Sequence, residues 1–121
     1  MNVIPLTLEE FVKNVVDVID HPHEWKYLGD LPCLIEFSAT WSEHYKEMTT
    51  VLNQLSFEFA NRVYIYRVDI DEEEDLLTAF DIEQVPTLLF CPMNEPPQKA
   101  LGLFDRETLR KGINEILLQT V

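Results

Sequence analysis

One stretch of the sequence, residues 33–60, constrains the fold more than any other, because an apolar strand runs almost directly into an amphipathic helix. Residues 33–37 are apolar except for Glu36, and such a run is typical of a central strand that is covered on both faces. Ser42 stands where the N-cap of the following helix is expected. Apolar side chains then recur three and four positions apart, at Met48, Val51, Leu52, Leu55 and Phe59. This stretch predicts an α/β fold.

The rest of the chain alternates between strand and helix patterns. We expect strands at about 3–6, 32–37, 63–69, 88–91 and 99–103. We expect helices at about 8–19, 42–60 and 72–80, and a last helix that Asp105 caps. Thr7-x-x-Glu10 is a capping box for the first helix. The order βαβαβαββα predicts partly parallel pairing of the first three strands and a terminal hairpin, within a single domain over residues 1–121.

The charge of the chain restricts its expected partners. Twenty-two acidic and nine basic side chains give a formal charge of −13, which repels phosphate backbones and anionic lipid. Nucleic acid is therefore not an expected partner, and no apolar run approaches the ~20 residues of a membrane span. The first residues lack the pattern of a signal peptide. A cytoplasmic location is expected if Met1 is the native start, and a periplasmic one if a signal was removed.

Three short patterns contain residues that could bind a metal ion or act as a nucleophile, but a structural role explains each of them better. The two imidazoles in His21-Pro22-His23-Glu24 lack the helical spacing that aims both at one metal ion. The acidic run 71–75 lacks the spacers and central glycine of a calcium loop, and it suits the first turn of a helix. Ser42 and His44 are two residues apart on a helix, so they do not face each other as a nucleophile and its base would. We expect no metal and no cofactor.

The strand-to-helix stretch resembles the active-site segment of thioredoxins, F-x-A-x-W-C-G-P-C-K. Phe37, Ala39, Trp41 and Lys46 match this pattern, whereas Ser42 and Tyr45 occupy the positions of its two cysteines. The resemblance implies the thioredoxin fold, a central mixed five-stranded sheet flanked by four helices. It also implies that the reactive centre of the family is missing from this chain.

Further matches follow in the family's order along about eighty residues. Glu36 falls where thioredoxins have a buried acid, and Arg67 where they have a basic partner for it. Val85-Pro86-Thr87 matches the loop that contains the family's cis-proline, and Gly102 matches the glycine at the wall of the substrate groove. Residues 24–29 are similar to those of bacterial extended thioredoxins.

The resemblance leaves three hypotheses for function. The first is a redox-inactive module that binds an unidentified protein or extended peptide noncovalently, in an oligomeric state that the sequence does not give. Its implied rim is Trp41, Ser42, Tyr45, Val85, Pro86, Gly102 and Leu103. This rim could instead only pack the domain, or the Tyr45 ring could fill the groove. The second hypothesis is a thiol–disulfide oxidoreductase or redox sensor in cell redox homeostasis that uses Cys33 and Cys91. The third is an assembly accessory for another protein.

The two cysteines have two interpretations. If the strands at 32–37 and 88–91 are antiparallel neighbours, as the family fold implies, Cys33 lies almost opposite Cys91. The two thiols could then form a cross-strand pair. The alternative is that both are small apolar residues of the core, because cysteine is commonly buried in that way.

Overall fold

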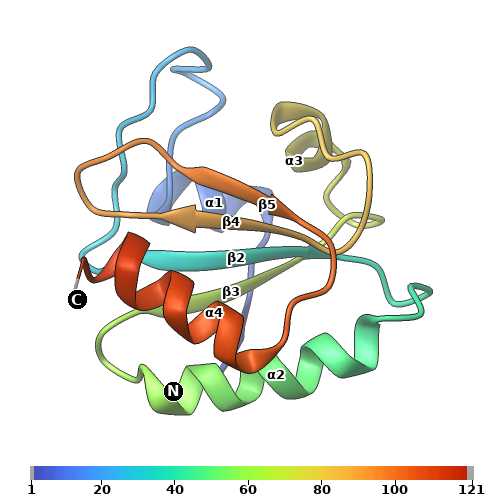
Figure 1. The fold of residues 1–121 in the computed structure, drawn as a ribbon. Coiled ribbons are helices and arrows are strands. Elements are labelled where there is room, and N and C mark those ends of the chain that lie inside the picture. The colour runs from blue at the N-terminus through green and yellow to red at the C-terminus, as the bar shows by residue number, and fades with distance from the viewer. Residues whose placement is uncertain (1, 120–121) are drawn as a thin grey trace.

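A computed structural model describes residues 2–119 (Figure 1). One five-stranded sheet runs through it, formed by β1 (Ile4–Pro5), β2 (Cys33–Ser38), β3 (Tyr64–Asp69), β4 (Thr87–Cys91) and β5 (Gln98–Leu101). The strand order is β1-β3-β2-β4-β5. β1 and β2 both pair with β3 in parallel, whereas β4 is antiparallel to β2 and to β5. The predicted mixed sheet and its terminal hairpin are confirmed.

Helices cover both faces of the sheet (Figure 1). They are α1 (Leu8–Asn14), α2 (Tyr45–Glu58), α3 (Glu74–Ala79) and α4 (Arg106–Gly112), and a π-helical segment, Ile113–Leu117, continues α4. α1 and α3 pack on one face, and α2 and α4 on the other. No helix within residues 2–119 is long and apolar enough to cross a membrane.

The centre of the sheet, β2, divides the core in two. All six of its residues are buried. Successive side chains of a strand point to opposite faces, so Cys33, Ile35 and Phe37 pack with α1 and α3 while Leu34 packs with α2 and α4. Glu36 follows Leu34 by two residues, so its side chain lies on the same face of the sheet and points toward α2.

The first helix is shorter than predicted. It ends at Asn14 rather than near residue 19, because the carbonyl of Val15 accepts a hydrogen bond from the N–H of Leu28 at 2.8 Å. Beyond it, the carboxylate of Asp17 accepts from the N–H groups of Ile19 and Asp20. Such local side-chain bonds compete with a helix. Val15 and Val16 are buried, so their apolar pattern reflects burial outside a helix.

The start of α2 also differs from the prediction. The helix begins at Tyr45, and His44, not Ser42, occupies its N-cap without a side-chain bond. Ser42 lies one turn earlier, where its N–H donates to Ala39 and its carbonyl accepts from Tyr45. The predicted cap role of Ser42 is therefore wrong.

The other predicted caps are confirmed. Thr7 Oγ1 accepts from the N–H of Glu10 at 3.3 Å, and Asp105 Oδ1 accepts from the N–H of Thr108 at 2.8 Å. The acidic run contributes to α3, although the helix itself begins at Glu74 rather than Glu72 and ends one residue before the predicted Phe80.

Two residues of α2 provide a test of this packing. Leu52 is fully buried between α2 and the sheet, whereas Phe57 on the same helix is 70% exposed. We expect Leu52→Ala to lower the free energy of unfolding by about 2–5 kcal/mol, because it removes buried methyl groups and leaves a cavity. Phe57→Ala should change it by roughly 0.5 kcal/mol or less. Urea denaturation measures both, and equal losses would contradict the assigned packing.

Candidate functional site

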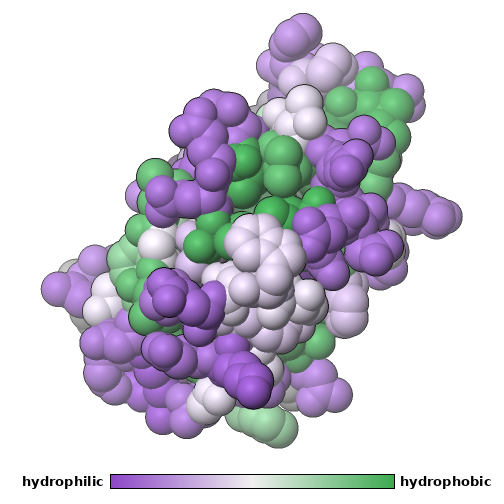
Figure 2. Space-filling model, turned by 90° about the vertical axis from the view of Figure 1, so that its right-hand side faces the viewer, coloured by the Kyte–Doolittle hydropathy of each residue, from purple (hydrophilic) through white to green (hydrophobic). Residues whose placement is uncertain are grey.

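Three connecting segments meet at one end of the sheet. They are the loop 39–44 after β2, the segment 84–86 before β4 and the loop 102–104 after β5. The register brings them together, because Phe37 near the end of β2 pairs with Thr87 at the start of β4, and Thr87 pairs with Leu101 at the end of β5. Figure 2 shows the molecule from this side, where apolar side chains gather at the centre of the face among hydrophilic ones.

The segment before β4 contains a backbone N–H and a carbonyl without hydrogen-bond partners. The Val85–Pro86 bond is cis, and Thr87 Oγ1 donates to the Gln84 carbonyl at 2.7 Å across this turn. The carbonyl of Pro86 accepts from the N–H of Gly102 at 2.9 Å. Within residues 2–119, neither the N–H nor the carbonyl of Val85 has a hydrogen-bond partner. The chain thus presents one free donor and one free acceptor beside the cis-proline.

Gly102 joins the third segment to this turn. Its φ of +100° lies in the left-handed region that other residues rarely adopt. A Cβ built at Gly102 would meet no atom within 4 Å, so the space beside its backbone is open. The flanking residues Leu101 and Leu103 are both exposed.

Trp41 stands out from the loop after β2. Its side chain is 68% exposed, which is unusual for the largest apolar side chain. The indole N–H donates to Asp71 Oδ2 at 2.9 Å, and this bond fixes one edge of the ring. An exposed, oriented aromatic ring is a common anchor in binding surfaces.

A buried ion pair lies beneath this surface. Glu36 is fully buried, and its Oε1 lies 2.6 Å from Nε of Arg67. Arg67 also donates to Thr49 Oγ1 and, at 3.1 Å, to the carbonyl of Tyr45. The predicted pairing of Glu36 with Arg67 is thus present in the structure.

The ion pair with Arg67 leaves the Glu36 carboxylate without an aligned hydrogen bond. The contact between Glu36 and Arg67 lacks the alignment of a hydrogen bond, and no other described residue donates to either Glu36 oxygen. Burial raises the pKa of the Glu36 carboxyl, while the charge of Arg67 opposes that rise. The site therefore holds an acid whose ionised form is poorly stabilised.

The structure brings most of the predicted rim residues together. Ser42, Tyr45, Val85 and Pro86 line one small void with Glu36. The ring of Tyr45 packs against the guanidinium of Arg67, 4.0 Å from its centroid. Ser42 Oγ accepts from the backbone N–H of His44 at 3.4 Å, and no hydrogen bond joins the Ser42 and His44 side chains among the described residues.

The two cysteines lie apart from the rim. Cys33 pairs directly with Cys91 across β2 and β4, at the end of β2 far from Ser38. Both thiols are free and fully buried. Burial raises the pKa of the Cys91 thiol, and the neighbouring Cys33 adds to that rise. They are core residues, and the cross-strand proximity that the family fold implied is present.

Sequence reasoning missed two supports of the site. The acidic run 71–75 predicts only the start of a helix, yet Asp71 accepts a hydrogen bond from the Trp41 indole N–H. No sequence pattern indicates Thr49, yet its hydroxyl accepts a hydrogen bond from Arg67 in the first turns of α2. Neither residue stands in a recognisable motif. Thr49 follows Tyr45 by four residues, which places both on the same helix face.

Comparisons with known proteins agree with this geometry. The family model described as thioredoxin matches residues 3–115. A thioredoxin of Borreliella burgdorferi is 32% identical over 112 residues, which cover 93% of this chain and 95% of that protein. A chloroplastic M-type thioredoxin of Spinacia oleracea is 29% identical over 89% of this chain and 60% of its own length. A crystal structure of chloroplastic thioredoxin z superposes with a TM-score of 0.76 over 96% of this chain and 95% of that one, at 21% identity, and shows that the fold is shared.

The buried acid gives a pH-dependent prediction. A folded-state pKa above the ordinary 4.5 means that the folded chain binds more protons than the unfolded chain, so Glu36 lowers stability as the pH rises through that window. We expect Glu36→Gln to gain stability relative to the wild type as the pH increases from 4 to 8. Urea unfolding at each pH measures the difference.

Asp105 supplies a control of opposite sign. The N–H of Thr108 lowers the pKa of its carboxyl below the ordinary 3.8, so its contribution is present at neutral pH and is lost as the pH falls. Asp105→Asn should therefore lose stability relative to the wild type as the pH rises from about 2 to about 5, a window below that of Glu36. A Glu36→Gln difference that is flat with pH, or that follows the Asp105→Asn trend, would contradict the assignment.

Proposed function

We propose that this chain, which belongs to the thioredoxin family, holds extended peptide segments noncovalently and takes no part in thiol–disulfide exchange. The observation that carries the proposal is the exposed Trp41 ring on the same face as the unpaired backbone N–H and carbonyl of Val85. An apolar anchor beside a free backbone donor and acceptor suits an extended chain. The rim that supports peptide binding comprises Trp41, Ser42, Tyr45, Val85, Pro86, Gly102 and Leu103.

The absence of a reactive thiol argues against an oxidoreductase. Disulfide exchange needs a thiolate that attacks and a second thiol that resolves the mixed disulfide. The segment 41–46 reads Trp-Ser-Glu-His-Tyr-Lys and has no sulfur. The sequence contains only two cysteines, and both are buried in the core, where the pKa of Cys91 is raised. A buried thiol that stays protonated is inert toward disulfides.

Strand addition is the proposed mode of binding. An extended peptide would accept a hydrogen bond from the Val85 N–H and donate one to its carbonyl, as in other cases of strand addition to a free edge. Gly102 would let the peptide backbone approach, because it has no side chain on the open side. Trp41 would cover one apolar side chain of the ligand. The charge of −13, with Asp71 beside Trp41, favours segments that contain Lys or Arg.

Selection from a display library of extended peptides tests the proposal. We expect selected peptides to lose affinity by roughly tenfold or more toward Trp41→Ser, because the variant removes an aromatic anchor. Phe57→Ser is the matched control, since Phe57 is equally exposed but lies on α2 away from the rim. Fluorescence anisotropy with a labelled peptide gives the dissociation constants.

A modified ligand tests the backbone pairing itself. N-methylation of the peptide residue that donates to the Val85 carbonyl should weaken binding, whereas N-methylation of its neighbours should have less effect. The proposed rim is wrong if neither the Trp41→Ser variant nor the N-methylated peptide changes the affinity. It is also wrong if Phe57→Ser weakens binding as much as Trp41→Ser.

A further inference from the structure

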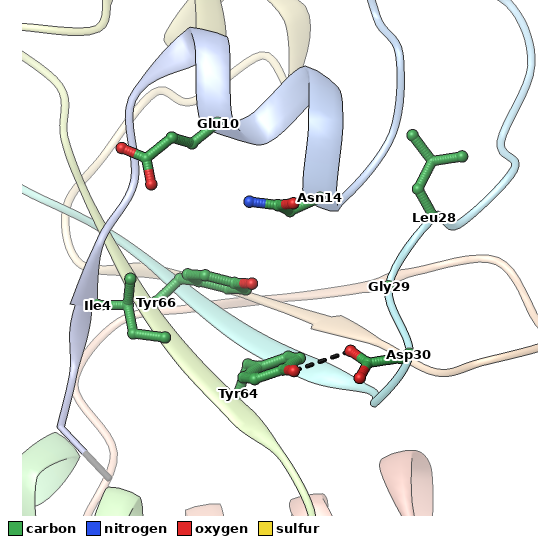
Figure 3. Close-up of a pocket in the computed structure, with 8 residues that line it drawn as sticks. All are labelled: Ile4, Glu10, Asn14, Leu28, Gly29, Asp30, Tyr64 and Tyr66. Carbon is green, nitrogen blue, oxygen red and sulfur yellow. Dashed lines mark hydrogen bonds between the residues drawn. The ribbon is translucent and has the colours of Figure 1, made fainter.

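A cavity lies between α1, the loop before β2 and β3 (Figure 3). It has a volume of about 430 Å³, which is in the range of small-molecule pockets. Glu10 and Asn14 of α1 line one side, and Asp30 of the loop before β2 lines another. Tyr64 and Tyr66 of β3 form its floor. Tyr64 pairs with Cys33 and Tyr66 with Ile35, so this cavity lies beside the first half of β2, whereas the rim lies beyond the other end of that strand.

The hydroxyl of Tyr66 is the feature that points to a ligand. Tyr66 is 5% exposed, yet among the described residues its hydroxyl has no hydrogen-bond partner. Figure 3 shows this hydroxyl directed into the cavity, toward the side of Asn14 and Asp30. This hydroxyl is the part of the side chain that stays accessible from the cavity, so a molecule that displaces water from it must supply a hydrogen bond in its place.

The charges around the cavity are negative. Asp30 accepts a hydrogen bond from the Tyr64 hydroxyl at 2.8 Å, and its remaining lone pairs are available. This bond is the main cause that raises the pKa of Tyr64. Burial is the main cause that raises the pKa of Tyr66, and the charges of Asp30 and Glu10 add to it. Both phenols therefore stay protonated at neutral pH. No Lys, Arg or His is among the residues that line the cavity.

The aromatic floor adds a second attraction for a cation. The ring centroids of Tyr64 and Tyr66 lie 5.9 Å apart with an interplanar angle of 39°. Figure 3 shows the two rings nearly edge-on, so that each turns a face toward α1. The negative face of a phenol ring attracts an ammonium ion placed above it.

We propose that this cavity binds an aliphatic ammonium ion, the group that a small diamine or a lysine side chain carries. An ammonium has three donors and no acceptor. The acceptors around the cavity are Tyr66 Oη, the Asp30 carboxylate and the Asn14 amide oxygen, and Glu10 lines the cavity on the side of Ile4. Ile4 and Leu28 would contact the methylene stem. An anion is repelled here, and an apolar molecule would leave the Tyr66 hydroxyl unpaired.

NMR titration of the ¹⁵N-labelled full chain at low ionic strength tests this site. The probes are cadaverine, its neutral analogue 1,5-pentanediol, and N-acetyl-lysine methylamide. Cadaverine should shift the amide signals of Asn14, Gly29 and Asp30 in a saturable manner, and pentanediol should not. Equal affinity for the lysine amide would identify a protein lysine as the ligand. Tighter binding of cadaverine would identify a free diamine, and either result supports the site.

Variants separate this site from attraction to an acidic surface. Asp30→Asn should weaken cadaverine binding roughly tenfold and Tyr66→Phe roughly threefold, because each removes one acceptor for the ammonium. Glu72→Gln with Glu74→Gln is the matched control, since it removes two exposed charges elsewhere. The proposal is overturned if pentanediol binds equally well, if no saturable shifts occur at these amides, or if the control weakens binding as much as Asp30→Asn. Trp41→Ser should leave this binding unchanged, so the result is independent of the proposed peptide rim.

Discussion

The double pairing of β2 is the constraint on which the rest of the structure depends. β2 forms a parallel ladder with β3 on one side and an antiparallel ladder with β4 on the other. All its side chains are buried, so a shift of one residue would exchange the two halves of the core. The same register places the end of β2 beside the start of β4, and thus places the loop of Trp41 near the cis-proline. The rim is a consequence of core packing.

The buried pair of Glu36 and Arg67 is the main departure from an apolar core. Burying a charge is costly unless its partner and hydrogen bonds compensate, and the carboxylate of Glu36 has an ion contact but no aligned hydrogen bond. In the proposed function this acid has no resolving thiol to serve. Arg67 nevertheless connects β3 to the first turns of α2 through Tyr45 and Thr49. The pair therefore positions the start of the helix that carries the rim residue Tyr45.

Sequence patterns predict the helices and strands well where buried residues recur at a regular spacing. They predict them poorly where individual hydrogen bonds determine where a helix begins or ends. The strands and the start of the first helix follow from apolar runs and from the Thr7 cap. The early end of α1 does not follow from these patterns, because the Leu28 N–H that binds the Val15 carbonyl comes from a distant segment. The predicted cap at Ser42 failed because the chain makes an extra turn before α2. The bond from Trp41 to Asp71 joins residues thirty positions apart, and no spacing rule indicates it.

Thioredoxin chemistry requires two thiols in the segment that leads into α2, and this chain has Ser42 and Tyr45 there instead. The measurement that tests this most directly is reduction of insulin disulfides by dithiothreitol, with and without the purified protein. We expect no acceleration over dithiothreitol alone from the wild type, and an acceleration from the double variant Ser42→Cys with Tyr45→Cys. Multiple turnovers by the wild type, still present in a Cys33→Ala, Cys91→Ala variant, would contradict a binding role that excludes disulfide exchange.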